Sequence, residues 1–279
     1  MNAQLVARST LDQQRFFQQH SRSIPVVEAT YWSFMLGGRV TLPLMLSYAD
    51  LLAMPAFDFE ALIACAGNSP GGPAVGQARW RGVSMTALLA EINPLPNSRY
   101  AHLYAVDGYS TSLSFEQLNS AVLVYAMNDA PLPPEHGGPL RLIVPGLYGY
   151  KMPKWIQRIL LADAPLAGFW EGRGWPQSGT VGPTAAFAQS VDQIAVGEPV
   201  NLAGYAFAGR VPVAQIELSV EDGPWMSVPV EPNAPQVAAY WSIDWTPPTA
   251  GAYVLRVRAR DAQGQRQTSP LHTITLYAR

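Results

Sequence analysis

The sequence predicts an α+β domain, in which helices and strands are mixed along the chain, followed by an all-β domain. Among its 279 residues, Pro (25) and Gly (23) are plentiful and only 14% of residues are charged. This balance favours short strands and ordered turns over long helices. Near residue 182 the apolar spacing changes from mixed periodicities to short alternating strands. We therefore expect two domains, residues 1–182 and residues 183–279.

Helical and extended patterns alternate in residues 1–182. Residues 9–23 are predicted as a short polar helix or an extended arm. Ser47–Leu52 is predicted as a short helix that ends before Pro55, because proline cannot continue a helix. Met85–Glu91 has apolar residues at helical spacing. Strands are expected at the apolar runs Tyr31–Val40, His102–Val106, Ala121–Met127, Leu140–Val144 and Trp155–Leu161.

Short strands separated by turn residues fill residues 183–279. Turn residues occur, for example, at Asp222-Gly223-Pro224 and at Gly264. About seven strands in a domain of this length is the pattern of a β-sandwich of immunoglobulin type. The clearest strands are expected at Val200–Gly204, Gln215–Val220, Tyr253–Ala259 and His272–Leu276.

Charge and hydropathy exclude several classes of partner. The net charge is −2, which gives no support to a nucleic-acid or acidic-membrane partner. No apolar stretch approaches the length of a membrane span. Met1–Arg8 has neither a basic region before an apolar core nor a twin arginine, so no export signal is expected. We expect a cytoplasmic protein, or a periplasmic one if a leader or a fused segment is missing.

Cys65 is the only cysteine of the chain, and it follows the apolar run Leu62-Ile63-Ala64 just before a Gly-Asn turn. A single thiol cannot form an intrachain disulfide or a zinc site made of several cysteines. Its thiolate is a soft ligand that suits metals preferring sulfur. Single cysteines are also often small buried hydrophobic residues. Taken alone, the residue leaves both interpretations open.

The segment His136–Trp155 is rich in groups that bind anions. Arginine offers a planar fork for phosphate oxygens and lysine a point charge, while glycines at both ends let backbone N–H groups approach the same oxygens. Cations beside a strand can instead form a solvated rim, and the residues alone favour neither reading. The cations are His136, Arg141, Lys151 and Lys154.

Three blocks of sequence resemble, in order and spacing, the molybdopterin core of the sulfite oxidase family: Cys65–Asn68, Ala78–Val83 and His136–Trp155. Val200–Asp261 is similar to the C-terminal immunoglobulin-like dimerisation domain of that family. The resemblance covers the chain from about Phe16 to its end. It implies a sulfite-oxidase-type mixed α/β molybdopterin core followed by an immunoglobulin-like sandwich, and an oxidoreductase that transfers oxygen atoms with one molybdenum–molybdopterin cofactor.

The resemblance also implies roles for individual residues. Cys65 would be the thiolate ligand of molybdenum, and Asn68 and Asp107 would contact the pterin. The pterin and its phosphate would be held by His136, Arg141, Lys154 and the backbone of Met152 and Pro153.

Partners follow from the same resemblance. Members of the family pass electrons singly to a separate acceptor, and no CxxCH haem-attachment motif occurs in this chain. A separate electron-transfer protein, either a cytochrome or a membrane haem subunit, is therefore expected. The second domain implies a homodimer, and the substrate is expected to be a small molecule.

The substrate pocket departs from the pattern of the family. Gln18 stands where sulfite oxidases have an arginine, and Ser69-Pro70 stands where arginines follow the CAGN motif. Trp175 falls, by spacing, at the active-site tyrosine. A pocket for the sulfite dianion needs paired cationic donors to offset desolvation. We therefore expect a neutral, aromatic mouth around Trp170 and Trp175, and an uncharged substrate such as a sulfoxide.

Two alternatives remain open at this point. One is a genuine sulfite dehydrogenase, in which other cations fold inward to restore the pocket. The other is a catalytically silent relative that serves as a binding or assembly module, although a silent pocket has no physical need for the thiol and the cations together. The compensating cations would come from Arg15, Arg22, Lys151 and Arg173.

The remaining motifs point to no other chemistry. His20, His102 and His272 lack ligand-like spacing and are predicted as surface or core histidines. No GxSxG elbow indicates a hydrolase. The glycine pairs are not dinucleotide fingerprints, because no G-x-G-x-x-G leads from a strand into a helix.

Overall fold

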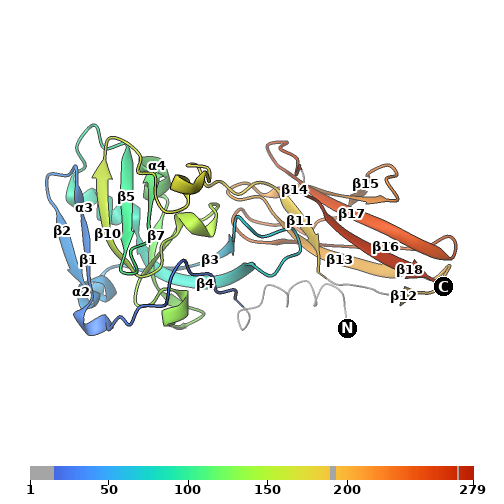
Figure 1. Cartoon of the computed structure of the whole chain (residues 1–279), viewed down its shortest axis with the longest axis horizontal. Coiled ribbons are helices and arrows are strands. Elements are labelled where there is room, and N and C mark those ends of the chain that lie inside the picture. The colour runs from blue at the N-terminus through green and yellow to red at the C-terminus, as the bar shows by residue number, and fades with distance from the viewer. Residues whose placement is uncertain (1–15, 189–192, 269) are drawn as a thin grey trace. The chain divides into compact units, whose positions relative to one another are not determined.

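The computed structural model describes residues 16–188, 193–268 and 270–279, which form mostly strands with a few short helices (Figure 1). The chain divides into two compact units. We call residues 18–66 and 78–180 the core unit, and residues 67–77 and 181–279, with Phe16 and Phe17, the sandwich unit. No helix in the described ranges is long and apolar enough to span a membrane. Of the arm predicted at residues 9–23, residues 9–15 lie outside the described residues, and residues 16–23 form no helix.

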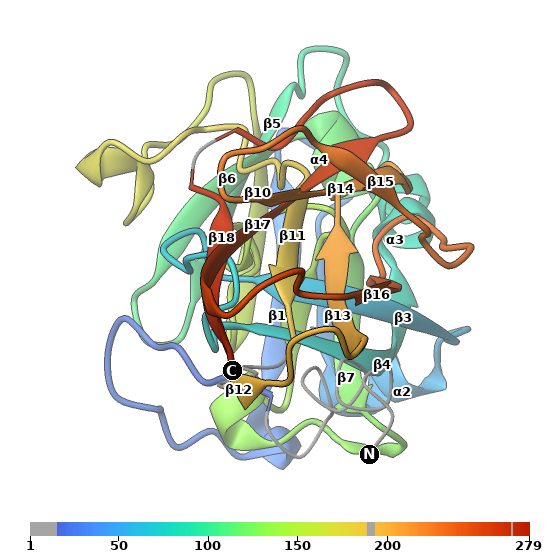
Figure 2. The same ribbon diagram turned by 90° about the vertical axis from the view of Figure 1, so that its right-hand side faces the viewer.

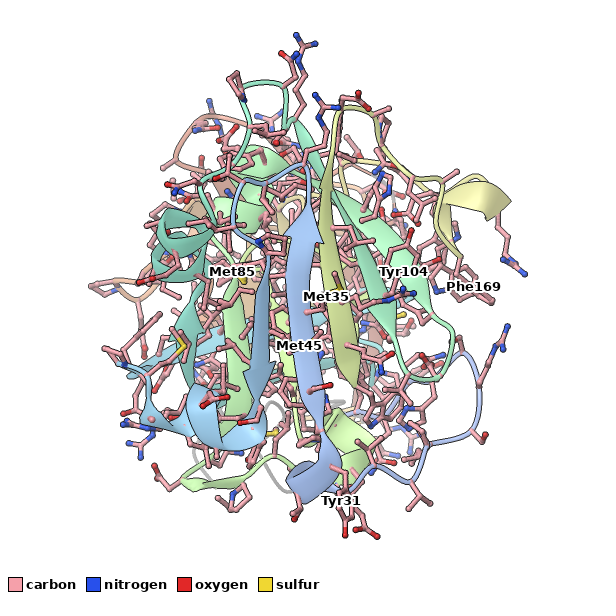
Figure 3. The ribbon with its side chains drawn as sticks, turned by 90° about the vertical axis from the view of Figure 1, so that its left-hand side faces the viewer. Tyr31, Met35, Met45, Met85, Tyr104 and Phe169 are labelled. Atoms are coloured by element: carbon pink, nitrogen blue, oxygen red, sulfur yellow. The ribbon has the colours of Figure 1, made fainter. Side chains whose placement is uncertain are left out.

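A five-stranded sheet, ordered β2-β1-β10-β5-β6, forms one layer of the core unit. Strands β1 and β10 are parallel, and the other neighbours are antiparallel. One face is buried, with Phe34, Leu36 and Leu103 fully enclosed. The opposite face carries Met35 paired with Met45, whose side chain is 61% exposed (Figure 3). The strands are β1 (Ser33–Gly38), β2 (Leu44–Ser47), β5 (Tyr100–Ala105), β6 (Ser110–Ser114) and β10 (Ile156–Ala162).

A second sheet of the core unit, ordered β3-β4-β7-β8, carries β9 as an additional partner of β7. Its apolar side chains are mostly enclosed, and Trp80 on β4 is fully buried with its ring N–H donating to the Ala61 carbonyl on β3 at 3.2 Å. The strands are β3 (Phe57–Ala64), β4 (Val75–Ser84), β7 (Val122–Met127), β8 (Ala130–Pro131) and β9 (Arg141–Ile143).

Side-chain capping explains where the α-helices begin. Ser47 and Asp50 form a capping box at the start of α2 (Tyr48–Ala53). Ser84 caps α3 (Met85–Ile92), whose buried residues recur at helical spacing. α4 (Phe115–Asn119) also starts on a capping box. Single turns of 3-10 helix lie at η2 (Ala29–Tyr31), η3 (Pro134–His136), η4 (Gly149–Lys151) and η5 (Glu171–Arg173).

Helix and strand coexist in the core unit, as the α+β class predicts, but the helices are shorter than that class suggests. The longest described α-helix has eight residues. Proline follows the ends of two of the helices, at Met54-Pro55 after α2 and at Asn93-Pro94 after α3.

Two sheets form the sandwich unit (Figure 2). One is ordered β11-β13-β16 and the other β12-β18-β17-β14-β15. They share one apolar cluster that includes Phe187, Leu202 and Trp241 from the first sheet and Leu218 and Leu255 from the second. The strands are β11 (Thr184–Phe187), β12 (Gln193–Ile194), β13 (Val200–Phe207), β14 (Val213–Val220), β15 (Met226–Val228), β16 (Ala239–Trp245), β17 (Gly251–Asp261) and β18 (His272–Ala278).

The loop of residues 67–77 belongs to the sandwich unit although it follows Cys65 directly in sequence. A Cβ added at Gly71 would lie 2.3 Å from the His272 ring. Gln77 accepts a hydrogen bond from the Ala238 backbone N–H at 2.8 Å. Both contacts tie the loop to the strands of the sandwich. Each compact unit is therefore made of separate stretches of the chain.

Candidate functional site

Cys65 immediately follows β3 and is partly exposed, with no disulfide partner. The η4 turn lies against the end of this strand, because a Cβ added at Gly149 would meet the Ile63 side chain at 3.2 Å and the Ala64 carbonyl oxygen at 3.6 Å. Burial raises the pKa of Tyr148, and the Cys65 thiol adds to that rise. The thiol is therefore accessible and has a phenol from the neighbouring turn beside it.

Arg141 is a buried cation on β9, with only 3% of its surface exposed. Its Nη1 donates to the His136 carbonyl at 3.0 Å, and its guanidinium lies 5.3 Å from the centre of the Trp80 ring. Its buried Nε has no hydrogen-bond partner among the described residues. Burial lowers the pKa of Arg141 to about 9. The position of this charge costs free energy that the surrounding protein does not offset.

Lys154 provides a second cation beside Arg141. Its Nζ contacts neutral acceptors, namely the backbone carbonyls of Glu135 at 2.7 Å and Gln19 at 3.2 Å and the ring Nδ1 of His20 at 3.3 Å. Burial, together with the charge of Arg141, lowers the pKa of Lys154 to about 7. A lysine with so low a pKa is held where its charge is poorly solvated.

Two histidines complete the cluster. His136 is buried, and burial together with Lys154 and Arg141 lowers its pKa to about 4. Burial and Lys154 also lower the pKa of His20, whose buried Nε2 has no hydrogen-bond partner among the described residues. We call His20, His136, Arg141 and Lys154 the cation cluster, although His136, with a pKa of about 4, is neutral at neutral pH.

Gly137 makes the cation cluster possible. Its φ is +108°, and an added Cβ would lie 2.9 Å from the Cβ of Lys154 and 3.0 Å from the Cβ of Arg141. Any larger residue would therefore push the two cations apart. This glycine lets the two side chains leave the backbone side by side.

No carboxylate forms an ion pair with Arg141 or Lys154 within the described ranges. The charges of Glu135 and Asp107 act to raise the pKa of Lys154, and Asp107 Oδ1 accepts from the Tyr109 backbone N–H at 2.9 Å. Asp107 is therefore near the cation cluster, and its predicted contact with the pterin is compatible with this position. A cluster of buried and half-buried basic side chains without an ion-paired carboxylate is suited to bind an anionic ligand such as a phosphate.

The backbone of residues 152–155 closes one side of the cluster. Met152 and Pro153 are buried, and the Pro153 carbonyl accepts from the Leu142 N–H of β9 at 3.1 Å. Trp155 is buried with φ at +49°, and its ring N–H donates to the Pro134 carbonyl at 2.8 Å. A tryptophan in this left-handed conformation is strained and persists only where the surroundings fix it.

Asn68 lies in the loop after Cys65 and uses its side chain within that loop. Its Oδ1 accepts from the Ala74 N–H at 2.9 Å, and its Nδ2 donates to the Gly72 carbonyl at 3.4 Å. Both ends of the amide are therefore engaged in shaping the loop. The predicted contact of Asn68 with a pterin stays a prediction.

The predicted pocket residues Gln18 and Trp175 have different surroundings. Gln18 is exposed and precedes the Gln19-His20 pair that contacts Lys154. Trp175 stacks on Trp170, with ring centres 4.4 Å apart, and meets Tyr150 edge-on at 4.9 Å. Tyr150 is the middle residue of the η4 turn, which lies against the end of β3. The structure thus links Trp175 to the Cys65 side of the core unit through that turn.

Lys151, one of the cations that could restore a sulfite pocket, is already neutralised. Its Nζ lies 2.5 Å from Glu171 Oε1, and the lysine side chain is fully buried. Arg173 donates to the Phe169 carbonyl at 2.5 Å and stacks on the Phe169 ring. Arg22 approaches Gly108, and Arg15 lies outside the described residues.

Sequence reasoning missed three residues that the structure brings to this region. Tyr148 lies beside Cys65, Glu171 neutralises Lys151, and His20 belongs to the cation cluster. His20 could have been found, because it ends the Gln18–His20 stretch that the family resemblance already marks. Glu171 carried no signal, since its partner is 20 residues away and a lone glutamate predicts nothing.

The chain matches the family model described as the oxidoreductase molybdopterin binding domain over residues 21–170. The uncharacterized oxidoreductase YuiH of Bacillus subtilis is 31% identical over 167 residues, covering 57% of this chain and 80% of that protein. The mitochondrial sulfite oxidase of Drosophila melanogaster is 28% identical over 181 residues, covering 56% of this chain and 31% of that protein. A nitrate reductase of Aspergillus niger is 28% identical over 177 residues, covering 54% of this chain and 20% of that protein.

Among solved structures, the sulfane dehydrogenase SoxCD of Paracoccus pantotrophus matches with a TM-score of 0.78 at 21% identity. The match covers 90% of this chain and 72% of that chain. At this identity the likeness shows the fold alone. The chain spans less than a third of the sulfite oxidase and about a fifth of the nitrate reductase that it matches.

Proposed function

Since this chain belongs to the family of oxidoreductases with a molybdopterin-binding domain, we propose that it transfers oxygen atoms to or from a small neutral substrate, with a sulfoxide as the leading candidate. The chain is an enzyme, and its cofactor is molybdenum–molybdopterin. When bound, that cofactor supplies the two-electron oxygen-transfer chemistry that amino-acid side chains lack. The protein contributes binding, orientation and charge.

The residues of the core unit fit this cofactor. The cation cluster would hold the pterin phosphate, because Arg141 Nε and His20 Nε2 are buried polar atoms without hydrogen-bond partners in the described part of the chain. Gly137 lets Arg141 and Lys154 approach the same anion. Cys65 would bind the molybdenum through its accessible thiolate. His136, Asp107 and the backbone of Met152 and Pro153 would contact the pterin, while the contact of Asn68, which lies in the loop of residues 67–77, stays a prediction from the resemblance.

The observation that carries the proposal is the cation cluster without acidic partners. Burying Arg141 and half-burying Lys154 without an ion-paired carboxylate costs free energy, which an anionic ligand would offset. A catalytically silent relative has no need for this cost. The retention of Cys65 at the accessible end of β3 points the same way.

The surroundings of η4 and η5 support a neutral substrate rather than sulfite. Side chains there are largely aromatic, with Tyr148, Tyr150, Trp170 and Trp175 in or next to the two turns. The one lysine in this region is neutralised by Glu171. A dianion would enter such surroundings without paired donors, which is unfavourable. In the reductive direction, a sulfoxide would take up two electrons and two protons to give a sulfide and water.

Further parts of the proposal concern partners and location. We propose that electrons are exchanged with a separate electron-transfer protein, either a cytochrome or a membrane haem subunit. We also propose that the protein is a homodimer through an immunoglobulin-like sandwich at residues 183–279, with the catalytic domain in residues 1–182. A cytoplasmic location is proposed, with a periplasmic one as the alternative.

Assays of molybdenum-loaded protein test the substrate. Protein made in a host that produces the cofactor would be offered dimethyl sulfoxide with reduced methyl viologen as electron donor, and separately sulfite with ferricyanide as electron acceptor. We expect sulfoxide turnover that depends on molybdenum content, and sulfite turnover at least about 100-fold weaker, since unpaired desolvation of one charge costs several kcal/mol.

The alternatives give different results in the same assays. Sulfite oxidation at ordinary enzymatic rates would establish a sulfite dehydrogenase and overturn the preference for a neutral substrate. A folded protein that takes up no molybdenum would support the silent module. A Trp175→Phe variant should keep its molybdenum and alter the KM for the sulfoxide.

A further inference from the structure

A buried carboxylate ties three separate segments of the core unit together. Glu171 Oε1 lies 2.5 Å from Lys151 Nζ of η4, and it accepts a hydrogen bond of 2.5 Å from Thr111 Oγ1 of β6. The Lys151 side chain is 0% exposed and the Glu171 side chain 4% exposed. The stem of Lys151 runs so close to Gly179 that a Cβ added there would lie 2.3 Å from Lys151 Cγ. These contacts fix η4, η5 and the edge strand β6 against one another.

Stability alone does not explain this ion pair. Glu171 Oε2 is buried and has no hydrogen-bond partner in the described residues. A buried ion pair stabilises a protein only when its remaining lone pairs and protons are also satisfied. Apolar side chains of similar size would serve stability as well or better. The best-attested use of such a pair is to specify one arrangement of the segments that carry it.

The two turns that contain Glu171 and Lys151 also carry a group of aromatic side chains that contact one another. Trp170 precedes Glu171 directly, and its ring stacks on Trp175 with an interplanar angle of 22°. Trp175 meets the ring of Tyr150 edge-on, and Tyr150 precedes Lys151. We call Tyr150, Trp170 and Trp175 the aromatic wall.

The aromatic wall and the cysteine share one turn of chain. Tyr148, beside Cys65, is two residues before Tyr150, and Gly149 between them packs on the end of β3. A shift of η5 relative to η4 would therefore move Trp170 and Trp175 relative to the Cys65 side of the unit. The Lys151–Glu171 contact is the ionic link between the two turns, and the Tyr150 hydroxyl adds a second polar link by donating to the Pro176 carbonyl at 2.5 Å.

We propose that the buried Lys151–Glu171 pair positions the aromatic wall beside the Cys65 end of β3 and so sets the size of the substrate that this side of the site accepts. The inference rests on the proposed reduction of a neutral sulfoxide. Lys151 and Glu171 act here as positioning residues and do not touch the substrate.

Glu171→Gln tests the inference in the molybdenum-loaded protein. The amide keeps the shape of the side chain but leaves the Lys151 charge unbalanced, so the turns should separate. Near-ultraviolet circular dichroism should lose the coupled signal of the stacked indoles. The preference for dimethyl sulfoxide over methyl phenyl sulfoxide should shrink by about tenfold, mainly through KM, as expected when a pocket wall moves. Molybdenum content should stay that of the parent.

A double variant separates positioning from stability. Lys151→Met with Glu171→Leu removes both buried charges, so the fold should be at least as stable as that of the parent. We expect the indole signal and the size preference to remain altered, because the ionic link between the turns is gone and the Tyr150–Pro176 hydrogen bond alone does not fix Glu171 and Trp170. If the double variant restored both, the pair would be ordinary packing and the inference would be wrong.

An exposed ion pair of the same unit provides the control. Asp58→Asn breaks the contact between Arg81 and Asp58 at 2.7 Å, both of which are nearly half exposed. It should change neither the spectrum nor the size preference, and an equal change in this variant would contradict the inference. If the parent reduced neither sulfoxide, the proposed substrate would fail. The indole signal of Glu171→Gln would still decide whether the pair positions the wall: an unchanged signal would refute it.

Discussion

The two units treat buried arginine in opposite ways. In the sandwich unit, Arg258 is 17% exposed and its Nε lies 2.7 Å from Glu217, while its guanidinium stacks on Trp225. In the core unit, Arg141 is more deeply buried and has no acidic partner among the described residues. A paired arginine completes its own environment, whereas an unpaired one needs a ligand. The comparison favours the core unit as the place of the proposed binding site.

Among the variants of the two units, replacement of Cys65 should have the largest effect, and that effect should be on turnover. Cys65→Ser should lower molybdenum-dependent turnover by at least about 100-fold, since even residues that only support a metal ligand cost about 10–100-fold. The sandwich unit should be unaffected, because Cys65 is outside it. Turnover per chain measures the loss of activity, and far-ultraviolet circular dichroism measures whether the strands of the sandwich unit stay folded. Full turnover in the variant would remove Cys65 from the site.

Replacing the two arginines should change stability in opposite directions. In cofactor-free protein, Arg141→Met removes an unpaired buried charge and should raise the free energy of unfolding by about 1–2 kcal/mol. Arg258→Met leaves Glu217 with only Arg266, at 3.7 Å, and should lower it by about 1–3 kcal/mol. Urea denaturation measures both, and changes of the same sign would break the comparison. In cofactor-loaded protein, Arg141→Met should also weaken cofactor retention.

The second cation without an ion pair, Lys154, should make the free energy of unfolding depend on pH. The pKa of Lys154 is about 7 in the folded chain, whereas an unfolded lysine titrates near ~10.4. Between these values the unfolded chain holds a proton that the folded chain lacks, so the stability of cofactor-free protein rises with pH. Below pH ~7 both states are protonated and this contribution levels off.

Lys154→Met should reduce that rise between pH 7 and 10. An exposed cation of the core unit, Arg158, supplies the control, and Arg158→Met should leave the rise unchanged. Denaturation midpoints at several pH values provide the measurement. An identical pH slope in parent and Lys154→Met would show that Lys154 is not held in a poorly solvated position.

The smallest effect on the free energy of unfolding should come from breaking an exposed ion pair of the sandwich unit. Asp222 contacts Arg256 but is 83% exposed, so water screens the interaction. Asp222→Asn should change the free energy of unfolding by less than about 0.5 kcal/mol. A loss comparable to that of Arg258→Met would mean that burial does not distinguish the ion pairs of this unit.

Local patterns in the sequence predicted much of the fold. The helix expected at Ser47–Leu52 forms because Ser47 and Asp50 cap it, and the one at Met85–Glu91 because its apolar residues face one side. Nothing local in the sequence reveals that Gly71, in the loop of residues 67–77, packs on His272. Such long-range packing has no signature in a single sequence.

The candidate site could be predicted only where its residues lie close together in the sequence. Arg141 and Lys154 stand in a dense block of cations and glycines, which indicated an anion site. That Lys151 is neutralised could not be predicted, because Glu171 lies in a different turn. Tyr148 reaches Cys65 only because η4 folds onto the end of β3. The sequence thus indicates which chemistry is present but not which charges remain unpaired.

X-ray absorption at the molybdenum edge tests the central claim most directly, by comparing the loaded parent with Cys65→Ser. The account predicts one molybdenum per chain in the parent, and one sulfur scatterer fewer around the metal in the variant. An unchanged sulfur count, or a well-folded parent that takes up no molybdenum, would contradict it.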